Sequence, residues 1–334
     1  MMSKIAILSC ISFILSILLM FNLLTLLPTK AQQQLFPNPA ITTPLVSTRG
    51  HFSLHTGELN SSRRLGSYDI SNVPGFNQTS CSTNGIALYV HGVWAGQAEA
   101  REQLDRVKSS LNANGFISPV VGFTWDSNTA ANPSGWVVSK FIANQNGPKL
   151  AKFISDFKDG CPGIPIRIIA HSLGARIVES TLVNLNNNQT WNNMGHKIDS
   201  IHLVGAAISD KATSRNTPFG AAINNMGTEF QNLYNPEDNN LQLSYKKTEN
   251  QNPLGLYGLQ KVEALPSNYT EANVRYEIPP LSKANGTYQP FCDFAIKVWG
   301  DNHCGYMGFR HPVPFSQFLK DDGAINVIVR DWNE

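Results

Sequence analysis

Charged side chains are scarce in this sequence. Asp, Glu, Lys and Arg make up 15% of the 334 residues, apolar residues make up 42%, and the formal net charge is +2. The Lys and Arg residues form no basic block. Because nucleic-acid binding needs clustered Lys and Arg against the phosphates, this composition argues against nucleic acid as the main partner. It indicates instead a globular chain that folds around a hydrophobic core.

Motifs that hold metals and nucleotides are also missing. The sequence contains no H-E-x-x-H zinc motif, no P-loop and no G-x-G-x-x-G fingerprint. None of its five cysteines lies in a C-x-x-C pair, so a zinc site is not expected. We therefore expect neither a metal nor a cofactor.

One long uncharged apolar run, residues 5–28, stands near the N-terminus behind Lys4. At about 1.5 Å per residue, a helix of this length would span a bilayer. Pro28 ends the run and Ala31 offers a small-residue cleavage site, which favours a cleaved signal peptide over residues 1–31. An uncleaved anchor, with membrane association through residues 5–28, is the alternative. Both place the rest of the chain outside the cytoplasm, either secreted or at the cell surface, because Lys4 is the charge expected to stay inside.

Four cysteines remain beyond the targeting segment: Cys81, Cys161, Cys292 and Cys304. An even number of cysteines is compatible with two disulfides and agrees with export from the cytoplasm.

The chain from residue 49 to 334 is expected to form one domain, preceded by a Gln-, Pro- and Thr-rich linker over residues 32–48. Apolar strands alternate with helices along it, which predicts an α/β fold with a mostly parallel sheet covered by helices on both faces. The expected strands are 51–59, 64–70, 85–92, 119–125, 166–170, 200–207, 230–236 and 273–279, and the clearest helices are 148–157 and 173–185.

A serine stands where the strand 166–170 gives way to the helix 173–185. Ala170 and Gly174 flank Ser172 at two residues on either side, and such small residues allow a sharp turn that exposes the hydroxyl. Catalytic groups of parallel sheets lie beyond the carboxyl ends of the strands, which is where this serine is expected. Serine is also a common helix N-cap, so A-H-S-L-G alone leaves both a nucleophile and an ordinary cap open.

The segment resembles the nucleophile elbow of the α/β-hydrolase superfamily, in its lipase-like and esterase-like branch. The resemblance covers most of residues 50–334, and it departs from the usual G-x-S-x-G at Ala170, which replaces the first glycine. It implies the α/β-hydrolase sheet, Ser172 as nucleophile and the amide of Leu173 as one donor to the oxyanion. A second match at residues 88–96, L-Y-V-H-G-V-W-A-G, implies the Val93 amide as the other donor, with Trp94 as the alternate.

The same resemblance implies a catalytic acid and a histidine, in the chain order serine, acid, histidine. Asp238 is the expected acid because it follows a strand and a small loop, and Glu237 beside it is the alternative. His303, in the polar loop G-D-N-H-C-G-Y-M-G, is the expected base, and His311 before a proline is the alternate.

Two further histidines, His91 and His171, are interpreted as structural. His91 would order the loop that follows its strand. His171 adjoins Ser172, and adjacent residues of the elbow point apart, so it is poorly placed to act as base.

Together, Ser172, Asp238 and His303 predict a serine hydrolase. It would cleave carboxylic esters, either small-molecule or lipid, through an acyl-enzyme. About 22 residues separate the strand at 200–207 from that at 230–236, too few for a large cap domain, so the site is expected to be open. Two other functions stay open: an acyltransferase on the same scaffold, and a surface binding protein that keeps the fold without the chemistry.

The resemblance also implies how the cysteines pair. Cys81 and Cys161 precede the strands at 85–92 and 166–170, which are parallel neighbours in the α/β-hydrolase sheet, so a Cys81–Cys161 disulfide is expected. Cys292 and Cys304 would then pair and close a short loop around His303.

Overall fold

The computed structural model describes residues 43–76, 81, 83–226, 228–259, 264–278, 289–290, 303–310 and 323–333. All of them belong to Thr43–Glu334, the second of two units into which the chain divides. The predicted targeting segment, residues 1–31 with the apolar run 5–28, lies outside the described residues. Within the described part, no helix has the length and apolar character needed to cross a membrane.

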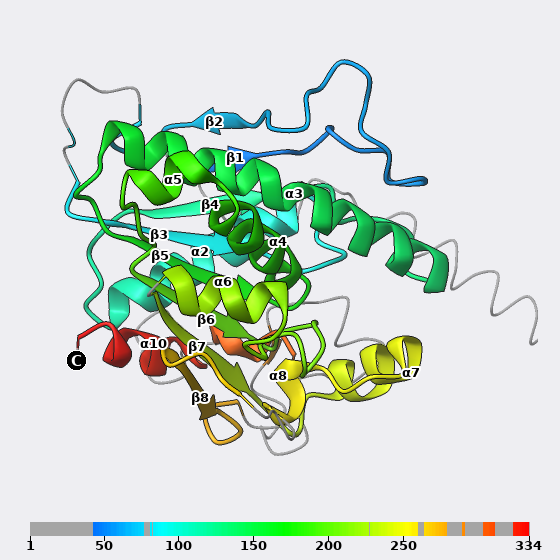
Figure 1. The fold of residues 1–334 in the computed structure, drawn as a ribbon. Coiled ribbons are helices and arrows are strands. Elements are labelled where there is room, and N and C mark those ends of the chain that lie inside the picture. Colours follow the sequence, from blue (N-terminus) through cyan, green and yellow to red (C-terminus); the bar gives the residue numbers. More distant parts are fainter. Residues whose placement is uncertain are drawn as a thin grey trace, which may run out of the picture. The chain divides into compact units, whose positions relative to one another are not determined.

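An eight-stranded sheet forms the centre of this unit (Figure 1). Its order is β2-β1-β4-β3-β5-β6-β7-β8, and every neighbouring pair is parallel except β1 with β2. This arrangement confirms the predicted fold class. The strands are β1 (Leu45–Ser47), β2 (Asp69–Ser71), β3 (Ile86–Val90), β4 (Val120–Thr124), β5 (Ile166–His171), β6 (Ser200–Val204), β7 (Glu229–Tyr234) and β8 (Tyr269–Asn273).

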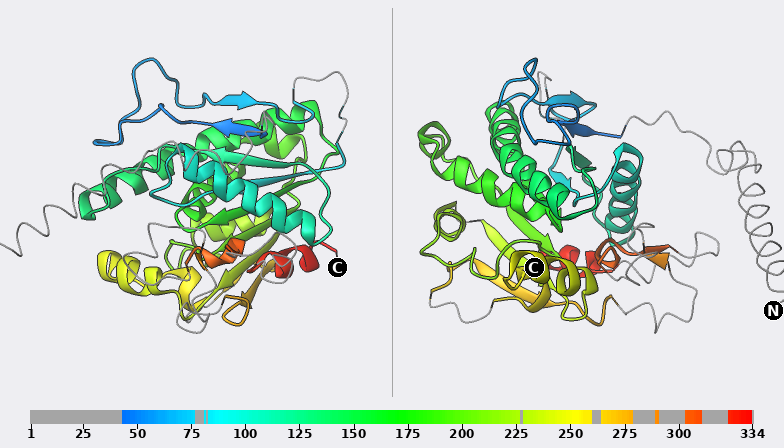
Figure 2. Two further views of the ribbon diagram at one scale, coloured as in Figure 1. Left: turned by 180° about the vertical axis from the view of Figure 1, so that it is seen from behind. Right: turned by 90° about the vertical axis from the view of Figure 1, so that its right-hand side faces the viewer.

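Helices cover both faces of the sheet, as Figure 2 shows in its right-hand view. The elements beside the sheet are α2 (Gln97–Ala113), α3 (Pro133–Gly160), α4 (Gly174–Asn186), α5 (Gln189–Asn193), α6 (Pro218–Met226), the π-helix η1 (Leu241–Tyr245), α7 (Lys246–Glu249), α8 (Leu254–Tyr257), the 3-10 helix η3 (Gly305–Met307) and α10 (Ile325–Asp331). A separate antiparallel pair consists of β9 (Gln289–Pro290) and β10 (Phe309–Arg310).

The hydrophobic core has two parts, one on each face of the sheet. In β3, Leu88 and Val90 pack into the cluster that contains residues of α3, α4 and α6, whereas Ala87 and Tyr89 pack into the cluster with α2 and α10. Successive side chains of a strand point to opposite faces, which explains this alternation. Because both faces are covered, β3 is buried along its whole length and reads as a continuous apolar run.

Several predicted elements differ from the observed ones. Residues 51–59 form only the isolated bridge Phe52–Leu59, because they turn back on themselves rather than join the sheet. Only the end of 64–70 overlaps β2, and the strand expected at 273–279 is β8, which ends at Asn273. Residues 45–47 lie inside the range predicted as a linker and instead pair with β4. A strand of three residues is too short to show the alternation of apolar and polar side chains by which a strand is recognised in a sequence.

The cysteine pairing agrees with the prediction for the first bond. Cys81 and Cys161 form a disulfide with their Cα atoms 5.7 Å apart, and the strands that follow them, β3 and β5, are parallel neighbours. Cys304 is disulfide-bonded as well. Its expected partner, Cys292, lies outside the described residues, so the Cys292–Cys304 pairing stays a prediction.

Candidate active site

Ser172 occupies the turn between β5 and α4 in a conformation that few non-glycine residues adopt. Its φ is 54°, in the left-handed region. The first helical residue is Gly174, the N-cap position belongs to Leu173, and no side chain caps this helix. Ser172 is therefore not the N-cap serine that the sequence left open. A strained residue at a strand-to-helix turn is the geometry of a nucleophile elbow.

Small residues let the chain approach Ser172 closely. A Cβ atom on Gly174 would lie 2.5 Å from the carbonyl oxygen of Val90, and one on Gly92 would lie 2.8 Å from the Cβ of Ser172. The backbone of Ser172 is also held on its other side: its N–H donates to Val204 at 3.0 Å, and its carbonyl accepts from Ala207 at 3.1 Å. The turn is thus fixed between the ends of β3 and β6.

Asp238 and His303, which are 65 residues apart in the chain, meet beside this turn. The Nδ1 atom of His303 lies 2.7 Å from Oδ2 of Asp238, and Asp238 is fully buried. The other carboxylate oxygen of Asp238 accepts from the Leu241 amide at 3.0 Å, at the start of η1. Glu237 turns elsewhere and pairs with Arg275 at 3.1 Å. Of the two carboxylates considered from the sequence, the structure brings only Asp238 to His303. His311 lies outside the described residues.

Tyr306 is a further residue of this site, which the sequence did not single out. Its hydroxyl lies 3.3 Å from Oδ2 of Asp238 and 3.4 Å from the carbonyl oxygen of Gly255. A Cβ on Gly205 would lie 2.7 Å from the Tyr306 ring, so glycine there leaves room for the ring. An aromatic residue three positions after the histidine was the only signal for it in the sequence.

His171 packs against His303. The two rings are 4.7 Å apart between centroids, and Nε2 of His171 donates to the His303 carbonyl at 2.9 Å. Burial and the neighbouring His303 hold the pKa of His171 well below its ordinary value, so its ring is neutral. His171 therefore steadies the backbone of the histidine loop, which agrees with the structural role predicted for it.

The loop after β3 lies directly against Ser172 and offers amide donors. Trp94, with a φ of 57°, is strained like Ser172, and its N–H donates to the Ser127 carbonyl at 2.8 Å. The Trp94 amide is therefore occupied. Among the described residues, the amides of Val93 and Leu173 have no hydrogen-bond acceptor. Of the two amides considered from the sequence as a second oxyanion donor, that of Trp94 already has an acceptor and that of Val93 has none among the described residues.

His91 is buried within the same loop and orders it. Its Nδ1 lies 2.8 Å from the Gly92 carbonyl, and Nε2 accepts from the Trp125 amide at 3.3 Å. Burial, aided by the positive charge of Arg49, lowers the pKa of His91 to about 3. A neutral ring that donates from Nδ1 and accepts at Nε2 satisfies both contacts. In the described part of the chain, no group of three His, Cys, Asp or Glu residues could hold a metal ion.

Residues 64–274 match the model of a family described as "Alpha/beta hydrolase of unknown function (DUF900)". The match spans more than half of the 334 residues. The chain belongs to this α/β-hydrolase family. The resemblance predicted from the sequence is thereby confirmed at the level of the fold and of hydrolase type. No curated protein matches the chain.

Solved structures similar to this hydrolase include esterases. An acetylxylan esterase solved at 0.90 Å has a TM-score of 0.36 and 12% identity, covering 75% of this chain and 98% of its own. The catalytic core of acetyl xylan esterase from Trichoderma reesei has a TM-score of 0.32 and 9% identity, covering 57% and 83%. Trichoderma reesei cutinase, in complex with a phosphonate inhibitor, has a TM-score of 0.24 and 18% identity, covering 37% and 52%. Likenesses this distant say nothing about the substrate of this hydrolase.

Proposed function

We propose that this hydrolase cleaves carboxylic esters, with Ser172 as nucleophile, His303 as general base and Asp238 as the acid that orients it. The observation that carries the proposal is the buried His303–Asp238 pair, 2.7 Å apart, beside a strained serine at the carboxyl end of the sheet. In a triad the acid contacts Nδ1 of the histidine and Nε2 takes the proton of the serine, so Asp238 at Nδ1 of His303 assigns the second role to Nε2.

The reaction would proceed in two steps. The Ser172 oxygen attacks the acyl carbon while His303 takes the hydroxyl proton, and the amides of Leu173 and Val93 stabilise the oxyanion. His303 then returns the proton to the leaving alcohol as the ester bond breaks. Water, activated by the same histidine, adds to the acyl-enzyme and releases the carboxylic acid and free Ser172.

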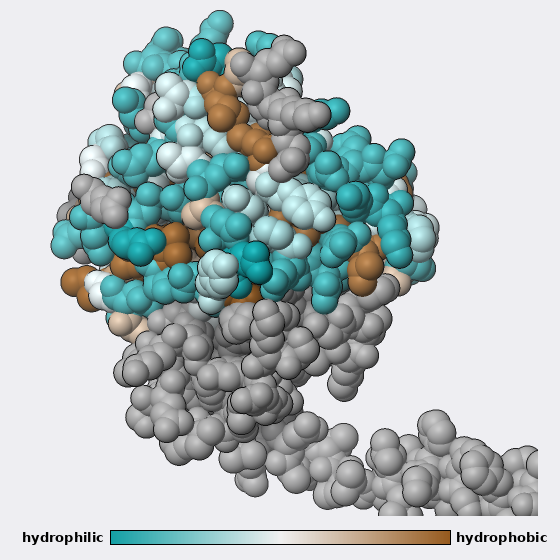
Figure 3. All heavy atoms as spheres, turned by 90° about the horizontal axis from the view of Figure 1, so that it is seen from below, coloured by the Kyte–Doolittle hydropathy of each residue, from teal (hydrophilic) through white to brown (hydrophobic). Residues whose placement is uncertain are grey.

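We propose short to medium soluble esters as substrates. Between β6 and β7 the described residues contain one helix, α6, and no cap domain, which supports an accessible site. Figure 3 shows one face on which the described surface is mainly hydrophilic and its apolar residues are scattered in small groups. The described residues of that face form no large apolar patch of the kind that adsorbs to a lipid surface.

We further propose that the domain acts outside the cytoplasm. The Cys81–Cys161 disulfide is compatible with that location, because disulfides persist in oxidising compartments. Secretion with loss of residues 1–31, and anchoring through residues 5–28, remain the two forms of this proposal.

A fluorophosphonate probe and a series of p-nitrophenyl esters test the proposal together. The probe should label the purified protein once, on Ser172, and the Ser134→Ala variant, which changes an exposed serine of α3, should label like the wild type. The ester profile should peak at short to medium acyl chains. Absence of labelling would indicate a binding protein without the chemistry, and a preference for C16 over C4 would overturn the substrate class.

A further inference from the structure

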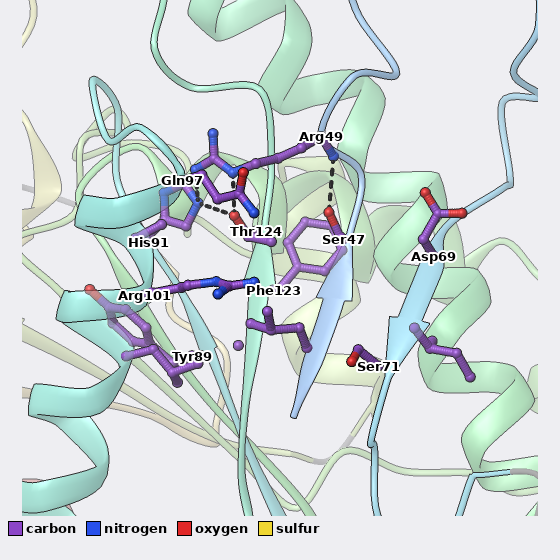
Figure 4. A pocket seen from close by; sticks show the side chains of 15 residues that line it. Ser47, Arg49, Asp69, Ser71, Tyr89, His91, Gln97, Arg101, Phe123 and Thr124 are labelled. Carbon is purple, nitrogen blue, oxygen red and sulfur yellow. Dashed lines mark hydrogen bonds between the residues drawn. The ribbon is translucent and has the colours of Figure 1, made fainter. Parts of the chain in front are cut away.

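Arg49 lies just beyond β1, yet its side chain reaches the loop after β3. Its Nε donates to the Thr124 hydroxyl at 2.6 Å, and its Nη2 donates to the carbonyl oxygens of Ala95 at 2.9 Å and Gly96 at 3.1 Å. The same Nη2 lies 3.3 Å from Nε2 of His91. Figure 4 shows the Arg49 side chain crossing Thr124 toward His91. One guanidinium therefore contacts both ends of the segment 91–96.

The backbone that carries Arg49 is itself held in place. Asp126, just beyond β4, accepts from the Gly50 amide at 2.8 Å with one carboxylate oxygen and from the Phe52 amide at 2.9 Å with the other. The Arg49 amide lies 3.3 Å from the Ser47 hydroxyl. The backbone at Arg49 is thus held in place. The planar guanidinium has several N–H donors and can bond to more than one carbonyl at once.

A second residue, Ser127, also holds the segment 91–96. The Ser127 hydroxyl donates to the Ala95 carbonyl at 2.7 Å, and the Ser127 carbonyl accepts the Trp94 amide. The carbonyl of Ala95 therefore receives donors from both Ser127 and Arg49. Such a loop, which contains the strained Trp94, keeps its shape only while these contacts oppose its relaxation.

We infer that Arg49 is a positioning residue for the oxyanion amide of Val93. Gly92 and Val93 lie between the two points that Arg49 contacts, His91 and Ala95–Gly96, and Gly92 is packed against Ser172. A shift of the loop would therefore move the Val93 amide relative to the nucleophile. The inference rests on the proposed function, since the Val93 amide matters only if an oxyanion forms.

The charge of Arg49 persists at neutral pH. Burial lowers its pKa to about 10, against the opposing effect of Asp126 and Glu99, so the guanidinium remains protonated well above pH 7. A cavity of about 210 Å³ adjoins the side chain and is also lined by Gln97 and Arg101. Removal of the Arg49 side chain would leave a space continuous with this cavity, which a free guanidinium ion could occupy.

The test compares Arg49→Ala and Arg49→Lys with a matched control, Arg101→Ala, an exposed arginine that lines the same cavity. With p-nitrophenyl butyrate, we expect kcat of Arg49→Ala to fall about 10- to 100-fold at a nearly unchanged KM, because an oxyanion donor acts in the transition state. Guanidinium at millimolar concentration should restore part of kcat in Arg49→Ala alone. Arg49→Lys should retain an intermediate kcat, and Arg101→Ala should match the wild type.

The outcomes separate this inference from the function on which it rests. Should kcat of Arg49→Lys and folded Arg49→Ala stay within twofold of the wild type while Ser172→Ala is inactive, Arg49 has no positioning role. An equal loss in Arg101→Ala, or a rise in KM without a change in kcat, would also overturn it. Activity that survives in Ser172→Ala overturns the proposed function and this inference with it.

Discussion

Two adjacent carboxylates, Glu237 and Asp238, have different surroundings although one peptide bond joins them. Asp238 is fully buried and contacts His303, Tyr306 and the Leu241 amide. Glu237 is partly exposed and pairs with Arg275. An acid that orients a catalytic histidine must be held rigidly away from water, so these surroundings suit Asp238 alone.

Replacement of each carboxylate by its amide tests this difference. Asp238→Asn should lower kcat by roughly 10⁴-fold, because the amide favours the wrong tautomer of His303. Glu237→Gln, the matched control, should change kcat by less than about threefold, since it removes only a partly exposed ion pair. Steady-state kinetics on both variants gives the answer. A larger loss of kcat in Glu237→Gln than in Asp238→Asn would show that Glu237, and not Asp238, is the acid.

The residues that we propose to carry the chemistry could be selected from the sequence, whereas the residues that contact them could not. The chain order of Ser172, Asp238 and His303 fits a known motif, which was enough to select them while Glu237 and His311 stayed open as alternates. Arg49 and Tyr306 contact carbonyls and a carboxylate that are distant in the chain. No local pattern encodes such contacts, because any polar side chain with the right reach could make them.

At the scale of elements, the turn after β5 and the loop after β3 depend on one close approach. A Cβ on Gly92 would lie 2.8 Å from the Cβ of Ser172 and 3.3 Å from Nδ1 of His171. One of the two segments must shift to admit a methyl group. The neighbouring strands are buried and hydrogen-bonded to each other, so the loop gives way more easily than the sheet.

We therefore expect Gly92→Ala to lower kcat about 10- to 100-fold through displacement of the Val93 amide, while the domain still folds. Gly160→Ala is the control, because a Cβ there would meet no atom within 4 Å. Melting temperature and kcat, measured on both variants, separate a local shift from general destabilisation. Wild-type kcat in Gly92→Ala would mean that the loop absorbs the methyl group without moving its amide.

Central strands were easier to predict than the elements at the sheet's edge and in its covering layer. β3, β4, β5 and β6 are buried along almost their whole length because both faces of the sheet are covered, so they are rich in apolar residues and each stood out in the sequence. The spacing of apolar residues predicted α3 only over 148–157, and Pro148, a residue type that favours the start of a helix, lies inside the observed helix. The helix instead begins at Pro133, capped by Asn132, and its Gly147 packs closely against Ser180 of α4. Tertiary packing here outweighs the local preference of proline.

Two neutral buried histidines, His91 and His171, make the whole molecule sensitive to acid. Burial lowers the pKa of His91 to about 3 and holds that of His171 well below its ordinary value. Below pH 6.5 the unfolded chain binds protons at both positions, whereas the folded chain does not. The free energy of unfolding should therefore fall as the pH drops, by about 1.4 kcal/mol per pH unit for each histidine.

Urea unfolding between pH 6.5 and 4.5 measures this effect. His91→Gln should show a shallower decline than the wild type, because one of the two proton-binding differences is gone. The slope of His196→Gln is measured for comparison. This variant replaces a buried histidine that pairs with the exposed Asp159. Equal slopes for the wild type and His91→Gln would show that His91 titrates alike in the folded and unfolded chain.

The central claim is that Ser172 is the nucleophile of an ester hydrolase, and the activity of Ser172→Ala tests it most directly. Purified wild type and Ser172→Ala should be compared by kcat/KM on p-nitrophenyl butyrate, with circular dichroism to confirm that both are folded. We predict a loss of at least roughly 10⁴-fold with an unchanged fold, as expected when a triad nucleophile is removed. A folded Ser172→Ala variant that keeps its activity within tenfold of the wild type would contradict the claim.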